Sequence, residues 1–345
     1  MKIALLGSGF IEPEIFKEEI EKRVSGCEFT SSRLPWPGKP RGNDDEIQEY
    51  AGTPDQVIKT AEDAEILVTD LAPVNAYVLN HLKNLKFIGV ARGGPVNINV
   101  KSATEHHVLV VNAPGRNGPA VAEFAVGLLL NLIRRIGAGE KSLRSGKWQS
   151  DLYNYETSGI ELEGRTAGII GCGQVGKRVA KLLKAFGMKV LVYDPFIDPA
   201  VCKSIGASLV SLEELLKNAD VLTIHARLTP QTKGMIGQKE LGKLKKGAFV
   251  INTARAPLLD YDALYHQLAN GSLAGAAIDV YHSEPPKLDN PLFSLPNVLA
   301  VPHIGGATQE SAKRGAAMVA EDIRRYFVEH VNPLHCKNKE LLTKK

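Results

Sequence analysis

No part of this chain restricts its possible folds as strongly as Gly171, Gly173 and Gly176, which form a G-x-G-x-x-G pattern. An apolar run at 167–170 precedes the pattern, and apolar residues that recur on one helical face follow it. A second apolar run, at 189–193, ends at Asp194, eighteen residues after Gly176. A strand, a glycine turn, a helix, a second strand and an acid in this order predict a βαβ unit that binds a dinucleotide.

Each glycine has a separate task in such a turn. Gly171 permits the tight turn, Gly173 lets a pyrophosphate approach the backbone, and Gly176 lets the helix pack against the sheet. The unpaired N–H groups at the start of the helix attract the phosphates. Asp194 is expected to accept hydrogen bonds from the ribose hydroxyls and to repel a 2′-phosphate, so the sequence favours NAD over NADP. The alternative is a glycine-rich turn beside a surface aspartate.

Strand-like runs alternate with helical patterns along almost the whole chain. They lie at 3–6, 66–69, 87–90 and 109–111 in the first half, and at 167–170, 189–193, 221–225, 248–252, 274–279 and 298–301 in the second. This alternation predicts an α/β fold with parallel sheets, and the length of 345 residues predicts two domains. We also expect a loop at 31–43, one long helix at 119–143 and a last helix at 309–328.

An irregular stretch at 145–163 contains Trp148, Tyr153 and Tyr155. Two interpretations of these aromatic residues are equally favoured: an arm that contacts another subunit, and a loop folded onto its own domain.

Composition and charge exclude several classes of function. Acidic and basic residues are interspersed and give a net charge of +4, so no nucleic-acid partner is expected. The most apolar stretch, at 121–133, is interrupted by Glu123 and Asn131 and is too short to span a bilayer, so no membrane partner is expected. The start of the chain reaches Glu12 too soon for a signal peptide. The four cysteines form no CxxC pair, so we expect no metal site and a cytoplasmic protein with reduced thiols.

Three charged side chains follow the ends of predicted strands, where open α/β sheets bind their ligands. Arg255 follows the run at 248–252, Glu284 follows the run that ends at Asp279, and His303 follows the run at 298–301. Reduction of a 2-keto acid requires a hydride at the carbonyl carbon and a proton at its oxygen, and an imidazolium supplies a proton near neutral pH. We therefore expect His303 to donate and accept this proton and Glu284 to raise the pKa of His303. Arg255 is expected to bind the substrate carboxylate or carbonyl.

Taken singly, each of these side chains has an ordinary alternative: a solvated arginine, a surface glutamate, and a histidine that shapes a turn. Their joint position beyond a dinucleotide pattern favours the catalytic interpretation. Asp279 is expected to hold the nicotinamide carboxamide, and His225 to line the cofactor groove. Gly7-Ser8-Gly9 also follows a strand, but it lacks a third glycine at the right spacing and is interpreted as a strand-to-loop turn.

Three segments together resemble a known family: LEGRTAGIIGCGQVG at 162–176, INTAR at 251–255 and NVLAVPHIGGAT at 297–308. They are similar to the D-isomer-specific 2-hydroxyacid dehydrogenases, the group with D-3-phosphoglycerate dehydrogenase and glyoxylate/hydroxypyruvate reductase. The resemblance implies two Rossmann-like doubly wound parallel-sheet domains. An NAD-binding domain at 119–307 would be inserted into a flavodoxin-like substrate-binding domain at 1–118 and 308–345. It also implies an NAD-dependent D-2-hydroxyacid dehydrogenase that forms a homodimer.

By this resemblance Arg255, Glu284 and His303 take the family's catalytic roles. The residues that fall where the family contacts NAD are Gln174, Val175, Asp194, Thr253, Ala254, Asp279 and Gly305. Arg92, Gly93 and Gly94 resemble the loop whose backbone N–H groups hold the substrate carboxylate, although Pro95 and Val96 follow where many members carry a further glycine.

The substrate side chain is left open by the sequence. The loops near Gly9, at 72–75 and near Gly94 carry no phosphate-binding cluster, which favours glyoxylate or hydroxypyruvate over a phosphorylated acid. Two other functions are weighed. One is an NAD-sensing binding module like the family's transcriptional corepressors, which can retain all three catalytic residues. The other is a formate dehydrogenase, whose family pairs the histidine with a glutamine, so Glu284 argues against it.

Overall fold

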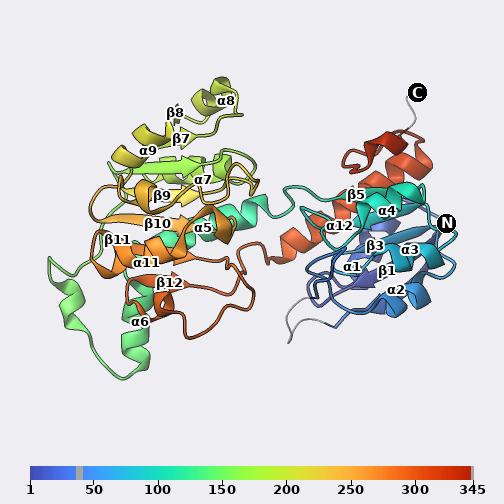
Figure 1. The fold of residues 1–345 in the computed structure, drawn as a ribbon, viewed down its shortest axis with the longest axis horizontal. Helices are drawn as coiled ribbons and strands as arrows, with labels where there is room; N and C mark the ends of the chain where they lie inside the picture. The colour runs from blue at the N-terminus through green and yellow to red at the C-terminus, as the bar shows by residue number, and fades with distance from the viewer. Residues whose placement is uncertain (36–41, 343–345) are drawn as a thin grey trace. The chain divides into compact units, whose positions relative to one another are not determined.

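The computed structural model describes residues 1–35 and 42–342. The chain divides into two compact units: unit 1 comprises Met1–Asn117 and Ala307–Lys345, and unit 2 comprises Gly118–Gly306. The expected domain boundaries at 118/119 and 307/308 each lie one residue from these positions. Unit 2 is thus an insertion in unit 1, and each unit has its own parallel sheet (Figure 1).

Unit 1 contains a five-stranded sheet in the order β2-β1-β3-β4-β5, and all its paired strands are parallel. This is the flavodoxin-like order, in which the direction of strand addition reverses between β1 and β3. The strands are β1 (Lys2–Gly7), β2 (Glu28–Arg33), β3 (Ile66–Thr69), β4 (Phe87–Val90) and β5 (Leu109–Asn112). The helices are α1 (Pro13–Glu21), α2 (Pro54–Ala61), α3 (Ala76–His81), α4 (Val100–Glu105) and α12 (Gln309–Ile323).

Both faces of this sheet are covered, which explains why its inner strands are continuous apolar runs. Ile3 and Leu5 point to the face covered by α1 and α12, whereas Ala4 and Leu6 point to the face covered by α2, α3 and α4. The alternation of side chains along β1 therefore places successive residues in two separate cores.

Unit 2 contains a seven-stranded parallel sheet in the order β12-β11-β10-β9-β6-β7-β8. Counted from β6, this is the Rossmann order 3-2-1-4-5-6 with one further strand at the edge. The strands are β6 (Thr166–Ile170), β7 (Lys189–Tyr193), β8 (Ser208–Leu209), β9 (Val221–Ile224), β10 (Ala248–Asn252), β11 (Leu273–Ile278) and β12 (Val298–Ala300). The helices are α5 (Gly118–Ile133), α6 (Ile136–Arg144), α7 (Gly176–Ala185), α8 (Pro199–Ser204), α9 (Leu212–Asn218), α10 (Gln238–Leu241) and α11 (Tyr261–Ala269).

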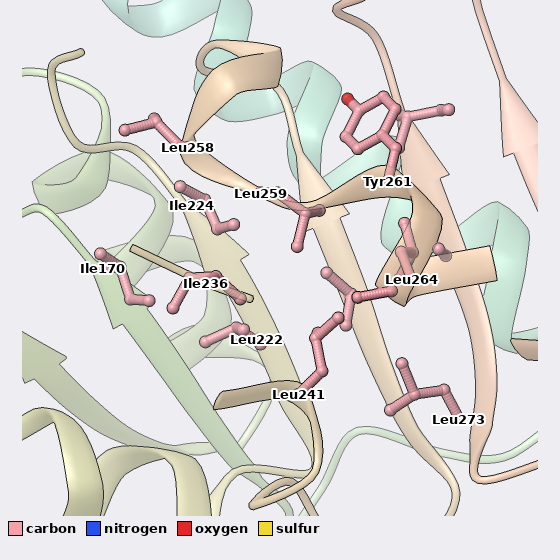
Figure 2. Close-up of a cluster of buried hydrophobic side chains, with 14 of the residues drawn as sticks. Ile170, Leu222, Ile224, Ile236, Leu241, Leu258, Leu259, Tyr261, Leu264 and Leu273 are labelled. Carbon is pink, nitrogen blue, oxygen red and sulfur yellow. The ribbon is translucent and has the colours of Figure 1, made fainter. Parts of the chain in front are cut away.

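Two apolar cores cover the faces of this second sheet. Figure 2 shows the first, in which Leu222 and Ile224 of β9 lie among side chains that include Leu241 of α10 and Leu264 of α11. Helices α5 and α7 cover the opposite face of the sheet. Buried side chains of both helices, including Leu129 of α5, form the second core there. The fold class expected from the sequence, two doubly wound parallel-sheet domains, is confirmed.

Polar residues before the first turn set where many of the helices begin. Thr53 accepts a hydrogen bond from the backbone N–H of Gln56 at the start of α2, and Ser211 does the same for Glu214 at the start of α9. Such a cap satisfies an N–H group that has no partner inside the helix. The same arrangement begins α3, α4, α8, α11 and α12, through Asn75, Asn99, Asp198, Asp260 and Thr308.

The expectation of one long helix at 119–143 is wrong, because the chain forms two helices there, α5 and α6, with a break between them. Arg135 has a φ of 55°, which interrupts the right-handed helix. A later segment also contacts the end of α5, since the N–H of Ile160 donates a hydrogen bond to the carbonyl of Ile133 at 3.1 Å. Because this contact joins residues far apart in sequence, the helical periodicity of the segment does not reveal it.

Two further expectations need correction. The expected loop at 31–43 begins inside β2, which extends to Arg33; positions 36–41 of that loop lie outside the described residues. Strand β2 lies at the edge of the sheet and is mostly exposed, so it lacks the apolar run that marks a buried strand. The expected last helix at 309–328 is α12 to Ile323, and residues Arg324–Val328 form a wider helical turn.

Short helical turns complete the structure at Ser150–Tyr153, Ala256–Leu258, Pro291–Ser294 and Lys339–Leu341. Among the described residues, no helix combines the length and the apolar character needed to cross a membrane.

Candidate functional site

The glycine turn between β6 and α7 has the geometry that a bound pyrophosphate needs. Gly171 has a φ of +85°, and a Cβ there would lie 2.6 Å from the backbone of Ala226. A Cβ on Gly176 would lie 2.1 Å from the carbonyl oxygen of Gly171, so only glycine lets the helix begin this close to the turn. Around Gly173, by contrast, a Cβ would meet nothing within 4 Å among the described residues, so the backbone is open on that side.

Asp194 lies at the end of β7 and is held by two backbone N–H groups. Its Oδ2 accepts a hydrogen bond from the N–H of Cys172 at 2.8 Å, and its Oδ1 accepts one from Phe196 at 3.0 Å. The first bond ties the acid directly to the glycine turn. Each carboxylate oxygen has two lone pairs, so both oxygens retain capacity for a ribose hydroxyl.

The other residues expected at the cofactor lie around the same edge of the sheet. Val175 immediately precedes α7, and Gln174 is exposed and accepts hydrogen bonds from Arg178. Thr253 is buried after β10, and its Oγ1 has no hydrogen-bond partner among the described residues. A buried hydroxyl without a partner is costly unless a ligand completes it, and an exposed glycine backbone is open to a ligand, so both features fit a bound dinucleotide.

His225 follows β9 and forms a hydrogen bond through Nε2 to Thr223 Oγ1 at 2.9 Å. Burial lowers the pKa of His225 to about 4, so this imidazole is neutral near neutral pH. A neutral side chain is compatible with the expected role of His225 in lining the cofactor groove.

His303 and Glu284 lie within hydrogen-bond distance of each other. Nδ1 of His303 lies 2.8 Å from Oε1 and 2.7 Å from Oε2 of Glu284. Both side chains are partly exposed. Because Nδ1 faces the carboxylate, Nε2 is the ring nitrogen that a substrate can reach. Nε2 has no hydrogen-bond partner among the residues that the structure describes. A histidine held by a carboxylate in this way can act as a proton donor.

The backbone at His303 is unusual, with a φ of 52°. Asp279 holds the segment that follows, since its Oδ1 accepts from the N–H of Ile304 at 2.7 Å and its Oδ2 from that of Gly305 at 2.9 Å. Burial raises the pKa of Asp279, while these two N–H groups act in the opposite direction. A Cβ on Gly305 would lie 2.7 Å from Oδ2 of Asp279, so glycine is needed for this contact. Asp279 is expected to hold the nicotinamide. These contacts show that it also shapes the loop that follows His303.

Tyr281 is a residue that the sequence analysis missed. Its backbone N–H donates to Oε1 of Glu284 at 3.2 Å, and its hydroxyl donates to the carbonyl of Val301 at 2.7 Å. It thus connects the loop that carries Glu284 with the strand end that carries His303. A tyrosine two residues after Asp279 is not informative in the sequence, because the contact with Val301 spans neighbouring strands.

Arg255 lies just beyond β10, the neighbour of β11 in the sheet. Strands β10, β11 and β12 are adjacent, so Arg255, Glu284 and His303 follow the same edge of one sheet. Asn252 shapes the turn, with Oδ1 accepting from the N–H of Ala254 and Nδ2 donating to the carbonyl of Arg255. The guanidinium is exposed and donates to the carbonyl of Ala254 at 2.7 Å.

The expected substrate loop lies in unit 1, after β4. The guanidinium of Arg92 pairs with the carboxylate of Glu49 and donates to its carbonyl at 3.0 Å. The carbonyl of Gly93 accepts from Asn112 Nδ2 at 2.8 Å. A Cβ on Gly93 or Gly94 would meet nothing within 4 Å in the described parts of the chain, so this backbone is accessible.

The Rossmann strand order and the glycine turn define unit 2 as a dinucleotide-binding domain. A family model described as "D-isomer specific 2-hydroxyacid dehydrogenase, NAD binding domain" matches residues 126–305. The chain belongs to the D-isomer-specific 2-hydroxyacid dehydrogenase family and carries the NAD-binding domain of that family, as the resemblance implied.

Three relatives illustrate the range of the family. D-3-phosphoglycerate dehydrogenase of Archaeoglobus fulgidus is 43% identical over 258 residues, which cover 75% of this chain and 48% of that protein. The chain thus spans about half the length of that relative. Glyoxylate reductase of Korarchaeum cryptofilum is 37% identical over 77% of this chain and 81% of its own length. The NAD-complexed D-isomer-specific 2-hydroxyacid dehydrogenase of Lactobacillus delbrueckii has a TM-score of 0.77 at 26% identity, covering 98% of this chain and 100% of that one.

Proposed function

We propose that this protein is an NAD-dependent dehydrogenase that interconverts a D-2-hydroxy acid and its 2-keto acid. The observation that carries the proposal is the pairing of His303 Nδ1 with the carboxylate of Glu284, at the same sheet edge as the dinucleotide turn. The relatives that are named phosphoglycerate dehydrogenase and glyoxylate reductase support this reaction class.

The residues of the glycine turn and Asp194 would hold NADH, which would supply the hydride for the carbonyl carbon of the keto acid in the direction of reduction. His303 gives the proton from Nε2 to the carbonyl oxygen, and takes it back in the direction of oxidation. Glu284 holds the ring through Nδ1 and so leaves Nε2 as the nitrogen that faces the substrate.

Substrate binding is assigned to two groups of donors. The exposed guanidinium of Arg255 binds the carboxylate or polarises the carbonyl, for which its planar fork is suited. The accessible backbone of Gly93 and Gly94, next to Arg92, holds the substrate carboxylate. A carboxylate bound in this way leaves the carbonyl of the substrate as the group that reacts.

The proposed cofactor contacts follow the same edge of unit 2. Gly171, Gly173 and Gly176 with Gln174 and Val175 hold the pyrophosphate, and Asp194 holds the ribose hydroxyls and disfavours a 2′-phosphate. Toward the nicotinamide end we assign His225, Thr253, Ala254, Asp279 and Gly305.

A homodimer in the cytoplasm completes the proposal. Trp148, Tyr153 and Tyr155 are 83%, 95% and 93% exposed, so these rings are not folded onto their own unit. Three exposed aromatic side chains in one segment are typical of a surface that contacts another protein, and we assign them to a second copy of this chain. The cysteines are free thiols, which is compatible with a reducing compartment.

The first test is oxidation of NADH, followed by its absorbance, with a panel of 2-keto acids and with NADPH in parallel. The wild type is expected to reduce at least one keto acid and to prefer NADH. His303→Ala should lower kcat by about 10²–10⁴-fold while leaving NADH affinity intact, because it removes only the proton donor. His266→Ala, an exposed histidine on α11, serves as the matched control.

Other results would redirect the proposal. Tight NADH binding without turnover of any keto acid would favour the NAD-sensing module. Keto-acid reduction at the wild-type rate in His303→Ala would show that His303 is not the proton donor. Oxidation of formate by the wild type would indicate the formate dehydrogenase alternative.

A further inference from the structure

Unit 1 gathers polar side chains at the carboxyl ends of its strands. Ser8 follows β1, Asp70 follows β3, Arg92 follows β4 and Arg116 lies beyond β5. Strand order reverses between β1 and β3, and open α/β sheets bind ligands in the crevice outside the strand ends at such a reversal. Ser8 and Asp70 occupy this position in unit 1.

Asp70 is a buried acid whose hydrogen bonding is incomplete. Its side chain is 2% exposed, and its Oδ2 accepts a hydrogen bond from Ser8 Oγ at 2.5 Å. The hydroxyl of Ser8 in turn accepts from the N–H of Phe10 at 3.1 Å, which fixes its direction. Oδ1 of Asp70 has no hydrogen-bond partner among the described residues. A buried carboxylate oxygen in this state fits a donor supplied by a bound ligand, because leaving it unpaired is costly.

Arg116 offers donors to the same part of unit 1, because Asp70 contacts Ser8 and Arg116 contacts Phe10. Its guanidinium lies over the ring of Phe10, 5.1 Å from the centroid, and Nη1 donates to Ser311 Oγ at 3.0 Å. Only Nη1 is engaged in hydrogen bonds within the described residues, so Nε and Nη2 remain as donors. Electrostatic interaction couples Arg116 and Arg92 to the charge of Asp70.

We propose that Asp70 and Arg116 recognise hydroxyl groups of the substrate, so that the preferred substrate is a 2-keto acid with at least one further hydroxyl. This inference rests on the proposed function and names the substrate class. A hydroxyl both donates and accepts, which matches a carboxylate oxygen as acceptor together with a guanidinium as donor. A methyl group in its place would leave Asp70 unpaired, and a phosphate would meet the negative charge of Asp70.

This substrate class narrows the expectation from the sequence. Glyoxylate, which the sequence analysis favoured together with hydroxypyruvate, has no group to fill this site. The loops considered there lacked a phosphate-binding cluster, but Ser8, Asp70 and Arg116 come from three separate segments and could not be recognised as one cluster.

The test compares kcat/KM for pyruvate, hydroxypyruvate, 3,4-dihydroxy-2-oxobutanoate and 3-phosphohydroxypyruvate. The wild type is expected to prefer hydroxypyruvate over pyruvate by about 10²-fold or more. Asp70→Asn should lower kcat/KM for the two hydroxylated acids by about 10-fold or more relative to kcat/KM for pyruvate. Arg116→Lys, which keeps the charge but loses the fork, should reduce the same preference. Asp63→Asn, which removes an exposed acid of unit 1, is the matched control.

Equal kcat/KM for pyruvate and hydroxypyruvate in the wild type would overturn the inference, as would an equal loss for both in Asp70→Asn. NADH affinity and the thermal melting curve of each variant show that the variant is folded.

A failure of the proposed dehydrogenase is distinguishable from a failure of this inference. If the wild type reduces no keto acid, the same site is tested by the shift in melting temperature with D-glycerate against D-lactate. Stabilisation by D-glycerate alone, lost in Asp70→Asn, supports the hydroxyl site. Equal or absent stabilisation by the two acids contradicts it.

Discussion

At the scale of single residues, the structure shows how a histidine is kept in an unfavourable conformation. A non-glycine residue with positive φ costs on the order of 1–3 kcal/mol. At His303 this cost is offset by contacts on each side: Tyr281 bonds to Val301, Glu284 bonds to the ring, and Asp279 bonds to Ile304 and Gly305. The position of the proposed proton donor therefore depends on its neighbours as much as on the histidine itself.

Tyr281→Phe tests this dependence, because it removes the hydroxyl and keeps the ring that packs 5.7 Å from Phe293. We expect kcat for keto-acid reduction to fall about 10-fold with little change in KM, because a less firmly held His303 is less often aligned for proton transfer. The measurement is kcat and KM for keto-acid reduction.

Tyr261→Phe is the control for this variant. The hydroxyl of Tyr261 is also buried and donates to the carbonyl of Val280 at 2.6 Å, so both variants should lose about 1 kcal/mol of stability. An equal kcat and KM in the two variants would show that Tyr281 has only a structural role.

At the scale of elements, the start of α7 is the most demanding junction of unit 2. The helix begins so close to the glycine turn that a Cβ on Gly176 would lie 2.1 Å from Gly171 O. The atom in conflict is backbone, so neither side can yield without moving the turn or the helix. Gly176→Ala tests this junction.

We expect Gly176→Ala to weaken NADH binding about 10-fold or more, because the phosphates depend on N–H groups that the displacement misplaces. Gly127→Ala is the matched control, since Gly127 lies within α5 and a Cβ there meets nothing within 4 Å in the described structure. Alanine inside a helix should stabilise the protein by about 0.5–1 kcal/mol. Fluorescence titration with NADH measures the affinity of each variant, and thermal melting measures its stability. Unchanged NADH affinity in Gly176→Ala would contradict the expectation.

At the scale of the whole molecule, one buried acid should make stability depend on pH. Burial raises the pKa of Asp70 from 3.8 to about 6, while the hydrogen bond from Ser8 acts in the opposite direction. Between pH 4 and pH 6 the folded state therefore binds more protons than the unfolded state, and stability falls as the pH rises. The full cost of burying the ionised carboxylate of Asp70, about 3 kcal/mol of the free energy of unfolding, is present above pH 6 and absent below pH 4.

Asp70→Asn should remove this part of the pH dependence. Relative to the wild type, the variant is expected to gain stability at pH 8 and not at pH 4. Urea unfolding at the two pH values measures the difference. A gain that is the same at both values would show that the carboxylate of Asp70 is not the group that titrates.

The amino-acid sequence by itself determined the buried strands, the glycine turn and the places where Arg255, Glu284 and His303 follow strand ends. These features depend on neighbours within a few residues, through the alternation of apolar side chains and the conformational freedom of glycine. The α/β fold with parallel sheets followed from them, the two doubly wound domains followed from the family resemblance, and both are confirmed. The roles of the three catalytic residues and of the cofactor contacts stay predictions.

Only the tertiary structure decided the polar edge strand β2, the break between α5 and α6, and the contacts that complete the sites. Tyr281 meets Val301, and Asp70 meets Ser8, because strands far apart in sequence are neighbours in the sheets. Strand order depends on which buried faces pack together across the whole unit, which is a property that no local pattern contains.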